Sequence, residues 1–118
     1  MGKRARRRGA AEKLVAPEAA YTSPGGDELV LRGAMTPKTR AQYASVLHGG
    51  LVQEDAWQRA VEFLFERLAV RWTVSGVPTE GQKPLLMRFR AATTGERAWI
   101  RSVLREHLAE HFPDVEAP

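Results

Sequence analysis

The sequence EDAWQRAVEFLFERLAVRW, residues 54–72, decides the fold of this chain. Its apolar side chains recur at intervals of three and four residues, which places them on one face of a helix. A face this broad predicts a helix that packs on a core rather than in a narrow coiled-coil seam. Its members are Trp57, Ala60, Val61, Leu64, Phe65, Leu68 and Trp72. Phe63 lies off this face, near Arg67, and must therefore contact either a second layer of the fold or a partner.

Length and composition limit the class of protein. A chain of 118 residues suffices for one domain with a single modest core. The absence of cysteine excludes disulfides, thiol chemistry and zinc sites with Cys ligands. No apolar run approaches the roughly 18 residues of a membrane span, and no apolar segment follows the basic N-terminus as it would in a secretory signal. We therefore expect a cytoplasmic protein without membrane contact.

The net charge of +4 is unevenly distributed along the chain. Residues 1–13 carry six basic side chains against Glu12 alone, a balance of +5, which leaves −1 for residues 14–118. The high pI therefore describes an N-terminal tail rather than a basic folded surface. Residues 1–17 have a composition typical of disorder, and residues 18–118 make up the single predicted domain.

Residues 19–32 contain a hairpin signal. A dense turn cluster, SPGGD at residues 23–27, is followed by a short predicted strand, ELVLR, at residues 28–32. A lone two-stranded hairpin is marginal in water, so it must pack against the helices or against another molecule. An exposed edge of this kind can also accept a strand from a partner.

The first helix has a clear start, whereas the end of the central helix is ambiguous. Thr36 is the predicted N-cap of a helix that runs to Leu47, with Pro37 at its first position. Residues 70–75 alternate as a strand would, yet we favour continuation of the central helix to about Thr73.

Two more helices complete the predicted fold. A short helix over residues 85–92 precedes a last helix, which opens with a capping box of Thr93 and Glu96 and ends at Phe112. The predicted fold class is therefore mostly α: a small domain of about four helices, a short N-terminal β-hairpin at residues 19–32 and a disordered basic tail.

Residues 107–111 read H-x-x-E-H, the inverted zinc-protease pattern, which puts two histidines one turn apart on a helix. Catalytic zinc needs three protein ligands, and His48, the remaining histidine, is predicted to lie in a loop. We expect instead that His107 flanks the core stripe and that His111 hydrogen-bonds carbonyls at the helix C-terminus. The sequence also lacks a phosphate loop and a nucleophile elbow, so we expect no metal, no cofactor and no enzymatic activity.

Three side chains are candidates for a groove that binds a partner protein: Phe63, Met87 and Phe89. Phe63 points away from the main stripe, and Met87 offers an adaptable apolar side chain. Grooves of this kind bind the apolar face of a helix from another protein.

The order of these segments resembles the small tail assembly chaperones of long-tailed phages and prophages. The strand DELVLRG (27–33), the capped helix MTPKTRAQYASVL (35–47), the Trp-anchored central helix and ERAWIRSVLREHL (96–108) carry the resemblance, which covers about residues 21–113. It implies a non-enzymatic protein of the host cytoplasm. Such a protein would bind helical stretches of a coiled-coil tape measure protein and help tail tube subunits assemble around it. The resemblance transfers no residue-specific site, and it does not extend to the basic N-terminal run.

The alternative hypothesis is a small nucleic-acid-binding adaptor or regulator that acts through its Arg-rich tail. Its contacts would be Lys3, Arg4, Arg6, Arg7 and Arg8. Phosphate binding by such residues weakens steeply with salt. No aromatic residue interleaves with them, so base stacking is not supported. We therefore favour the protein-binding assembly factor.

Overall fold

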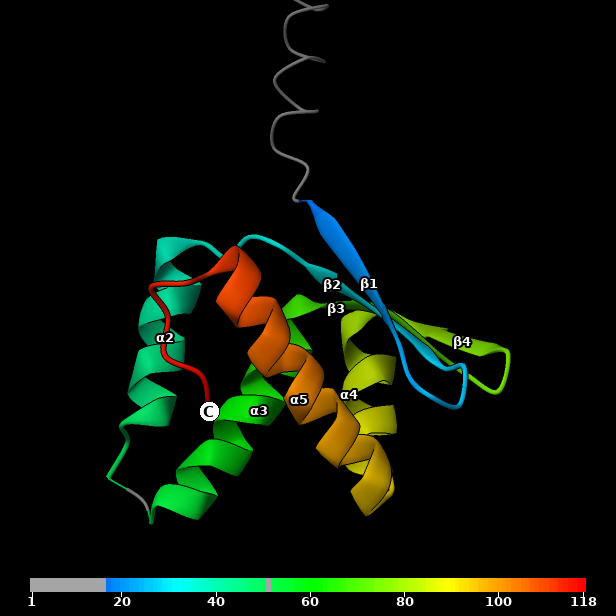
Figure 1. Cartoon of the computed structure of the whole chain (residues 1–118). Coiled ribbons are helices and arrows are strands. Elements are labelled where there is room, and N and C mark those ends of the chain that lie inside the picture. The colour runs from blue at the N-terminus through cyan, green and yellow to red at the C-terminus, as the bar shows by residue number, and fades with distance from the viewer. Residues whose placement is uncertain (1–16, 51) are drawn as a thin grey trace, which may run out of the picture.

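The computed structural model describes residues 17–50 and 52–118. In this part of the chain four strands and four helices follow one another (Figure 1). In chain order they are β1 (Glu18–Thr22), β2 (Glu28–Arg32), α2 (Pro37–Leu47), α3 (Gln53–Leu68), β3 (Ala69–Val74), β4 (Val77–Glu80), α4 (Gln82–Arg90) and α5 (Thr94–His111). Four helices are present as predicted, although α4 spans Gln82–Arg90 rather than residues 85–92. The tail predicted over residues 1–17 lies outside the described residues except for Pro17.

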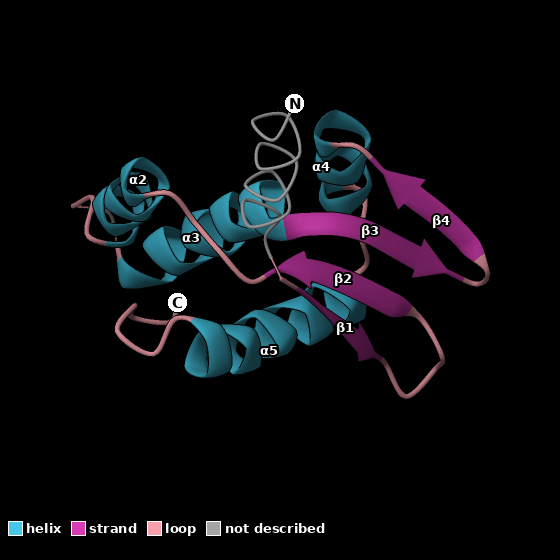
Figure 2. Cartoon of the chain, turned by 90° about the horizontal axis from the view of Figure 1, so that it is seen from above, coloured by secondary structure: helices cyan, strands magenta, loops and turns pink. Residues whose placement is uncertain are grey.

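The strands form one antiparallel sheet in the order β1-β2-β3-β4. β1 and β2 pair from Glu18↔Arg32 to Thr22↔Glu28, and β3 pairs with the other side of β2. In Figure 1 the helices lie on one side of this sheet, to its left and below it, and Figure 2 shows β1 and β2 crossing above α5. The four predicted helices are present, but they pack on a four-stranded sheet, so the fold is not the purely helical layer with a lone hairpin that the sequence predicts.

The prediction that the central helix continues to about Thr73 is wrong. α3 ends at Leu68, and β3 begins at Ala69 without an intervening loop. Ala69 has extended backbone at φ −68° and ψ 129°, while its N–H still donates to the Phe65 carbonyl. Pairing with β2 on one side and β4 on the other satisfies the backbone groups of this segment, and its β-branched side chains suit a strand. Trp72 is buried, so the strand still delivers the last apolar residue of the stretch to the core.

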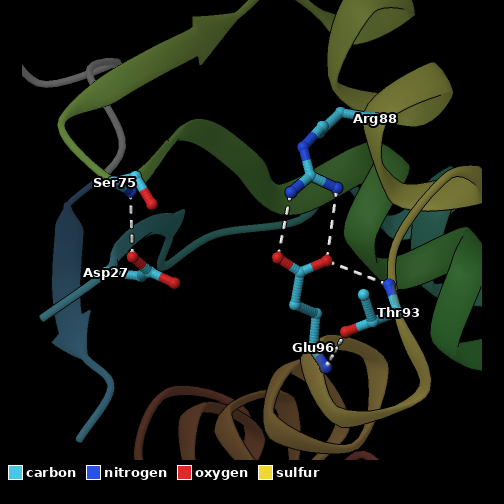
Figure 3. A network of polar contacts seen from close by, with 5 residues as sticks. All are labelled: Asp27, Ser75, Arg88, Thr93 and Glu96. Atoms are coloured by element: carbon cyan, nitrogen blue, oxygen red, sulfur yellow. Dashed lines mark hydrogen bonds and ion pairs between the residues drawn. The ribbon is translucent and has the colours of Figure 1, made fainter. Parts of the chain in front are cut away.

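The hairpin predicted over residues 19–32 is present, but as half of a larger sheet rather than alone. Its turn is closed by the N–H of Gly26, which donates to the Ser23 carbonyl at 2.9 Å. Gly26 has φ 94°, which glycine adopts without a steric penalty. Asp27 Oδ1 accepts from the N–H of Ser75 at 3.1 Å, and this bond ties the turn to the β3–β4 turn (Figure 3).

The apolar stripe of α3 faces the core, as the sequence predicts. Its buried members are Ala56, Ala60, Val61, Leu64, Phe65 and Leu68. Both predicted helix starts are also confirmed. Thr36 Oγ1 accepts from the N–H of Thr39 at 3.1 Å, and Thr93 and Glu96 form a reciprocal capping box. These local bonds satisfy N–H groups that would otherwise have no partner in the first helical turn.

His107 of α5 is fully buried and ties α5 to the first hairpin. Its Nε2 lies 2.7 Å from the carbonyl oxygen of Arg32, and its Nδ1 lies 2.7 Å from the Tyr21 hydroxyl. Because a carbonyl oxygen only accepts, Nε2 carries the proton and Nδ1 accepts from Tyr21. The neutral ring thus satisfies both neighbours. Burial lowers the pKa of His107 below its ordinary value.

We expect acid to destabilise the fold through His107 before the carboxylates titrate. The pKa of this histidine is lower in the folded chain than in the unfolded chain, where it is about 6.5. The unfolded chain therefore takes up the proton first. The stabilisation is complete above about pH 6.5 and is lost as the pH falls below that value. Urea denaturation between about pH 7.5 and about pH 5 measures this loss.

The matched variants are His107→Gln, which cannot titrate, and His48→Gln, which replaces an exposed histidine whose Nε2 lies 3.2 Å from Glu116 Oε1. The wild-type chain and His48→Gln should lose free energy of unfolding over this range, and His107→Gln should lose less. An equally steep loss in His107→Gln would contradict the role of the buried ring.

Candidate functional site

The structure places the three predicted partner-binding side chains in three different environments. Phe63 is partly buried, with its ring centroid 6.3 Å from that of Tyr43, so α2 is the second layer that its off-stripe position requires. Phe89 is 5 % exposed and stacks on Phe65 at 4.9 Å. Met87 is 65 % exposed. The three side chains therefore do not form one surface.

The other predicted site residues are not brought into a site either. Lys3, Arg4, Arg6, Arg7 and Arg8 lie outside the described residues. His111 lies in the last turn of α5, and its ring centroid is 4.5 Å from that of His107. Among the residues that the structure describes, no three histidine, aspartate or glutamate side chains gather as metal ligands would. Both ring nitrogens of His107 are already hydrogen-bonded within the fold.

A groove of about 630 Å³ opens between α3, α4 and α5. Its lining comes from residues 54–62 of α3 and residues 94–101 of α5, together with Phe89 of α4. These two half-helices lie at the bottom of Figure 1, away from the sheet. The lining consists of Glu54, Asp55, Gln58, Arg59, Val61, Glu62, Phe89, Thr94, Arg97, Ala98 and Arg101.

The two walls of this groove carry opposite charge, apart from Arg59 on the α3 wall. Glu54 and Asp55 lie in the first turn of α3, where the helix dipole favours acidic side chains. Arg97 and Arg101 lie on the α5 wall. None of the ion pairs in the described part of the chain joins the two walls. The charges of the walls are therefore not neutralised across the groove.

The arginines of the α5 wall are positioned by aromatic rings. The Arg97 guanidinium lies 5.5 Å from the Phe89 ring centroid and donates to the Arg90 carbonyl at 2.7 Å. The Arg101 guanidinium lies 5.1 Å from the ring centroid of Trp57 on α3. Guanidinium groups are attracted to aromatic faces, so these contacts hold both charges at the groove.

A network around Glu96 fixes the corner between α4 and α5 (Figure 3). Arg88 Nη2 donates to Glu96 Oε2 at 2.9 Å, and the N–H of Thr93 donates to Glu96 Oε1 at 2.9 Å. The Arg88 guanidinium also lies 4.6 Å from the Trp72 ring centroid, which connects this corner to the sheet. The hydrogen bond from Arg88, followed by that from Thr93, lowers the pKa of Glu96. The position of the α5 wall depends on this network.

Sequence reasoning misses this groove because its walls are far apart along the chain. The signals that could have indicated it are local. Glu54 and Asp55 begin the central helix, and Arg97 and Arg101 are four residues apart, on one face of the last helix. That these two faces oppose each other follows from the position of α4.

Comparison with known proteins does not place this chain in a family. The chain matches no protein-family model, no curated protein and no solved structure. The resemblance to the phage tail assembly chaperones therefore stays a prediction. Within the described ranges, none of the helices has the length and apolar character needed to cross a membrane.

Glu96→Ala should lower the free energy of unfolding by about 1 to 2 kcal/mol, because it removes half of a capping box and a partly buried ion pair. Glu110→Ala, at an exposed position of the same helix, should change it by less than about 0.5 kcal/mol. Urea denaturation near neutral pH measures both values. A double-mutant cycle with Arg88→Ala isolates the ion pair. An equal loss of free energy of unfolding in Glu96→Ala and Glu110→Ala would contradict the role of Glu96. So would the absence of coupling between Glu96→Ala and Arg88→Ala in the cycle.

Proposed function

We propose that this chain is a non-enzymatic assembly factor that binds a helical segment of another protein in the groove between α3 and α5. One observation carries the proposal: two walls of opposite charge flank apolar residues, and no ion pair of the described residues joins them. The apolar residues are Ala98, which is exposed, and Val61 and Phe89, which form the floor of the groove and are 6 % and 5 % exposed. Such a groove accepts the apolar stripe of a helix, while each wall attracts the opposite charge on one flank of that helix.

The charges of the groove define the chemistry of the partner. Its helix would carry basic residues on the flank that faces Glu54 and Asp55, and acidic residues on the flank that faces Arg97 and Arg101. Helices with an apolar stripe between flanks of Lys and Glu are typical of coiled coils. A coiled-coil protein exposes such stripes before it assembles, and a protein that covers them prevents aggregation.

The finer proposal is that the partner is the tape measure protein of a phage tail. Two arguments support it: the order of segments that resembles the tail assembly chaperones, and the match between the groove and coiled-coil chemistry. In that setting the protein would act in the host cytoplasm. It would shield helical segments of the tape measure protein while the tail assembles.

The perturbed titratable groups support a binding role rather than a catalytic one. Burial lowers the pKa of His107 and raises the pKa of Tyr43. His107 bonds to the first hairpin, and the Tyr43 hydroxyl donates to the Glu116 carbonyl at 2.6 Å. Groups that transfer protons in catalysis are perturbed in a cleft where a substrate can reach them. Here His107 is fully buried, and Tyr43 borders a hollow beside α2 but has its hydroxyl engaged by the Glu116 carbonyl.

The test is a fluorescence-anisotropy titration of the full chain with three synthetic helical peptides of about three heptads each. All three share one apolar stripe. The first has Lys along one flank and Glu along the other, the second has Glu on both flanks, and the third has Lys on both. We expect the mixed-charge peptide to bind at least about tenfold more tightly than the others, because it alone can pair with both walls.

Ala98→Trp should weaken binding of the mixed-charge peptide at least about tenfold, equivalent to about 1.4 kcal/mol, because the indole fills the groove. Ala109→Trp is the matched control, since Ala109 is an exposed alanine of α5 that does not line the groove. Equal binding of the three peptides, or equal binding by both variants, would contradict the proposal.

The alternative role, nucleic-acid binding through the Arg-rich tail, has the charge of residues 1–13 as its support. It predicts that binding to duplex DNA falls steeply as salt increases, with a log–log slope of about −4 to −5 if the five basic residues at positions 3–8 each neutralise one phosphate. Deletion of residues 3–8 should abolish this binding. Unchanged affinity after the deletion would remove this alternative.

A further inference from the structure

The segment that follows α5 folds back along α2, where Figure 1 shows it in red. Phe112 caps α5 and is buried, and the N–H of Val115 donates to the Phe112 carbonyl at 2.9 Å. Val115 and Ala117 are partly buried and pack against the core. Residues 113–118 therefore lie on the helical layer as a bound peptide would.

Two hydrogen bonds hold the backbone of this segment. The Tyr43 hydroxyl donates to the Glu116 carbonyl at 2.6 Å, and Arg105 Nη1 donates to the Pro118 carbonyl at 2.6 Å. Tyr43 is itself buried, so its hydroxyl is held in place by the core. Hydrogen bonds to backbone carbonyls can form with any residue type at that position. They therefore recognise the path of the backbone rather than particular side chains.

Two ion pairs contact acidic side chains of the segment. Arg40 pairs with Asp114 at 3.0 Å, and His48 pairs with Glu116 at 3.2 Å when its ring is protonated. All four side chains are substantially exposed, so each pair contributes little to the stability of the fold. The pairs instead favour a ligand with carboxylates two residues apart.

The segment does not fill the surface that it occupies. A hollow of about 420 Å³ remains between α2 and the segment. Tyr43, Leu47 and His48 line it from α2, and Asp114 and Val115 line it from the segment. The hollow is open to solvent, so a ligand can reach the side chains that line it.

We propose that the surface formed by α2 and α5 is a binding site for an acidic peptide segment, and that residues 113–118 occupy this site as a replaceable intramolecular ligand. Residues 113–118 define the kind of ligand that the site accepts. It takes Asp and Glu two residues apart, with apolar residues between and after them. A partner protein that carries such a segment would displace residues 113–118. This site is separate from the groove between α3 and α5.

A ligand that is part of the chain competes at a high effective concentration, commonly in the millimolar range. A free peptide therefore binds the wild-type chain weakly. Weakening the intramolecular ligand without removing it should reveal the site. The full-length double variant Asp114→Asn/Glu116→Gln does this, because it keeps the backbone contacts and removes both ion pairs.

The experiment is an NMR titration with the acetylated peptide FPDVEAP, which reproduces residues 112–118, and with the same peptide carrying Asn and Gln in place of Asp and Glu. The amide signals of α2 report binding. The acidic peptide should bind the double variant about threefold to tenfold more tightly than it binds the wild-type chain, since the loss of two exposed ion pairs weakens the competitor. It should also bind about threefold to tenfold more tightly than the neutral peptide, because two exposed ion pairs are removed.

A charge exchange provides the specificity control. Arg40→Glu should lose affinity for the acidic peptide and regain it for a peptide with Lys in place of Asp114. Recovery by the exchanged peptide also shows that the variant is folded. No saturable change in α2, equal binding of acidic and neutral peptides, or no recovery would overturn the proposal. A wild-type dimer that the acidic peptide dissociates would place the segment of a second copy in the site, and would overturn the assignment to residues 113–118 of the same chain.

Discussion

The packing of Trp72 against the helices holds the helical layer on the sheet. The Phe65 ring of α3 lies 5.8 Å from the Trp72 ring of β3 and 4.9 Å from the Phe89 ring of α4. Because α3 runs into β3 without a loop, the backbone itself fixes Phe65 relative to Trp72. Arg88 then stacks on Trp72 and pairs with Glu96, which carries the constraint into α5. The separation of the two charged walls therefore depends on this aromatic cluster.

The features that the sequence predicts correctly are those decided within a few residues. The cap at Thr36, the capping box at Thr93 and the apolar face within residues 54–68 all depend on near neighbours. The strand at residues 69–74 does not, because its apolar residues fit both a helical stripe and a strand alternation. Pairing with β2 decides between them, and β2 lies about forty residues earlier in the chain. Strand preference depends on such context more than helix preference does.

The candidate site shows the same limit. Phe63 and Phe89 are both predicted to contact a partner, yet α2 covers Phe63 and α3 covers Phe89. The bond between Tyr21 and His107 joins residues 86 positions apart, and the sequence gives no sign of it. The exposed surfaces that could bind a partner are the charged N-terminal turns of α3 and α5 and residues 113–118, which lie on α2. In both surfaces, buried residues of the core position the exposed side chains.

We propose that a partner protein binds in the groove between α3 and α5. Chemical-shift mapping of the isotope-labelled full chain with a mixed-charge amphipathic helix measures this most directly. The account predicts that the amides of Gln58, Ala98 and Arg101 shift in a saturable manner, while those of Thr22 and Glu80 on the sheet do not. Saturable shifts confined to the sheet, or no shifts at all, would contradict it.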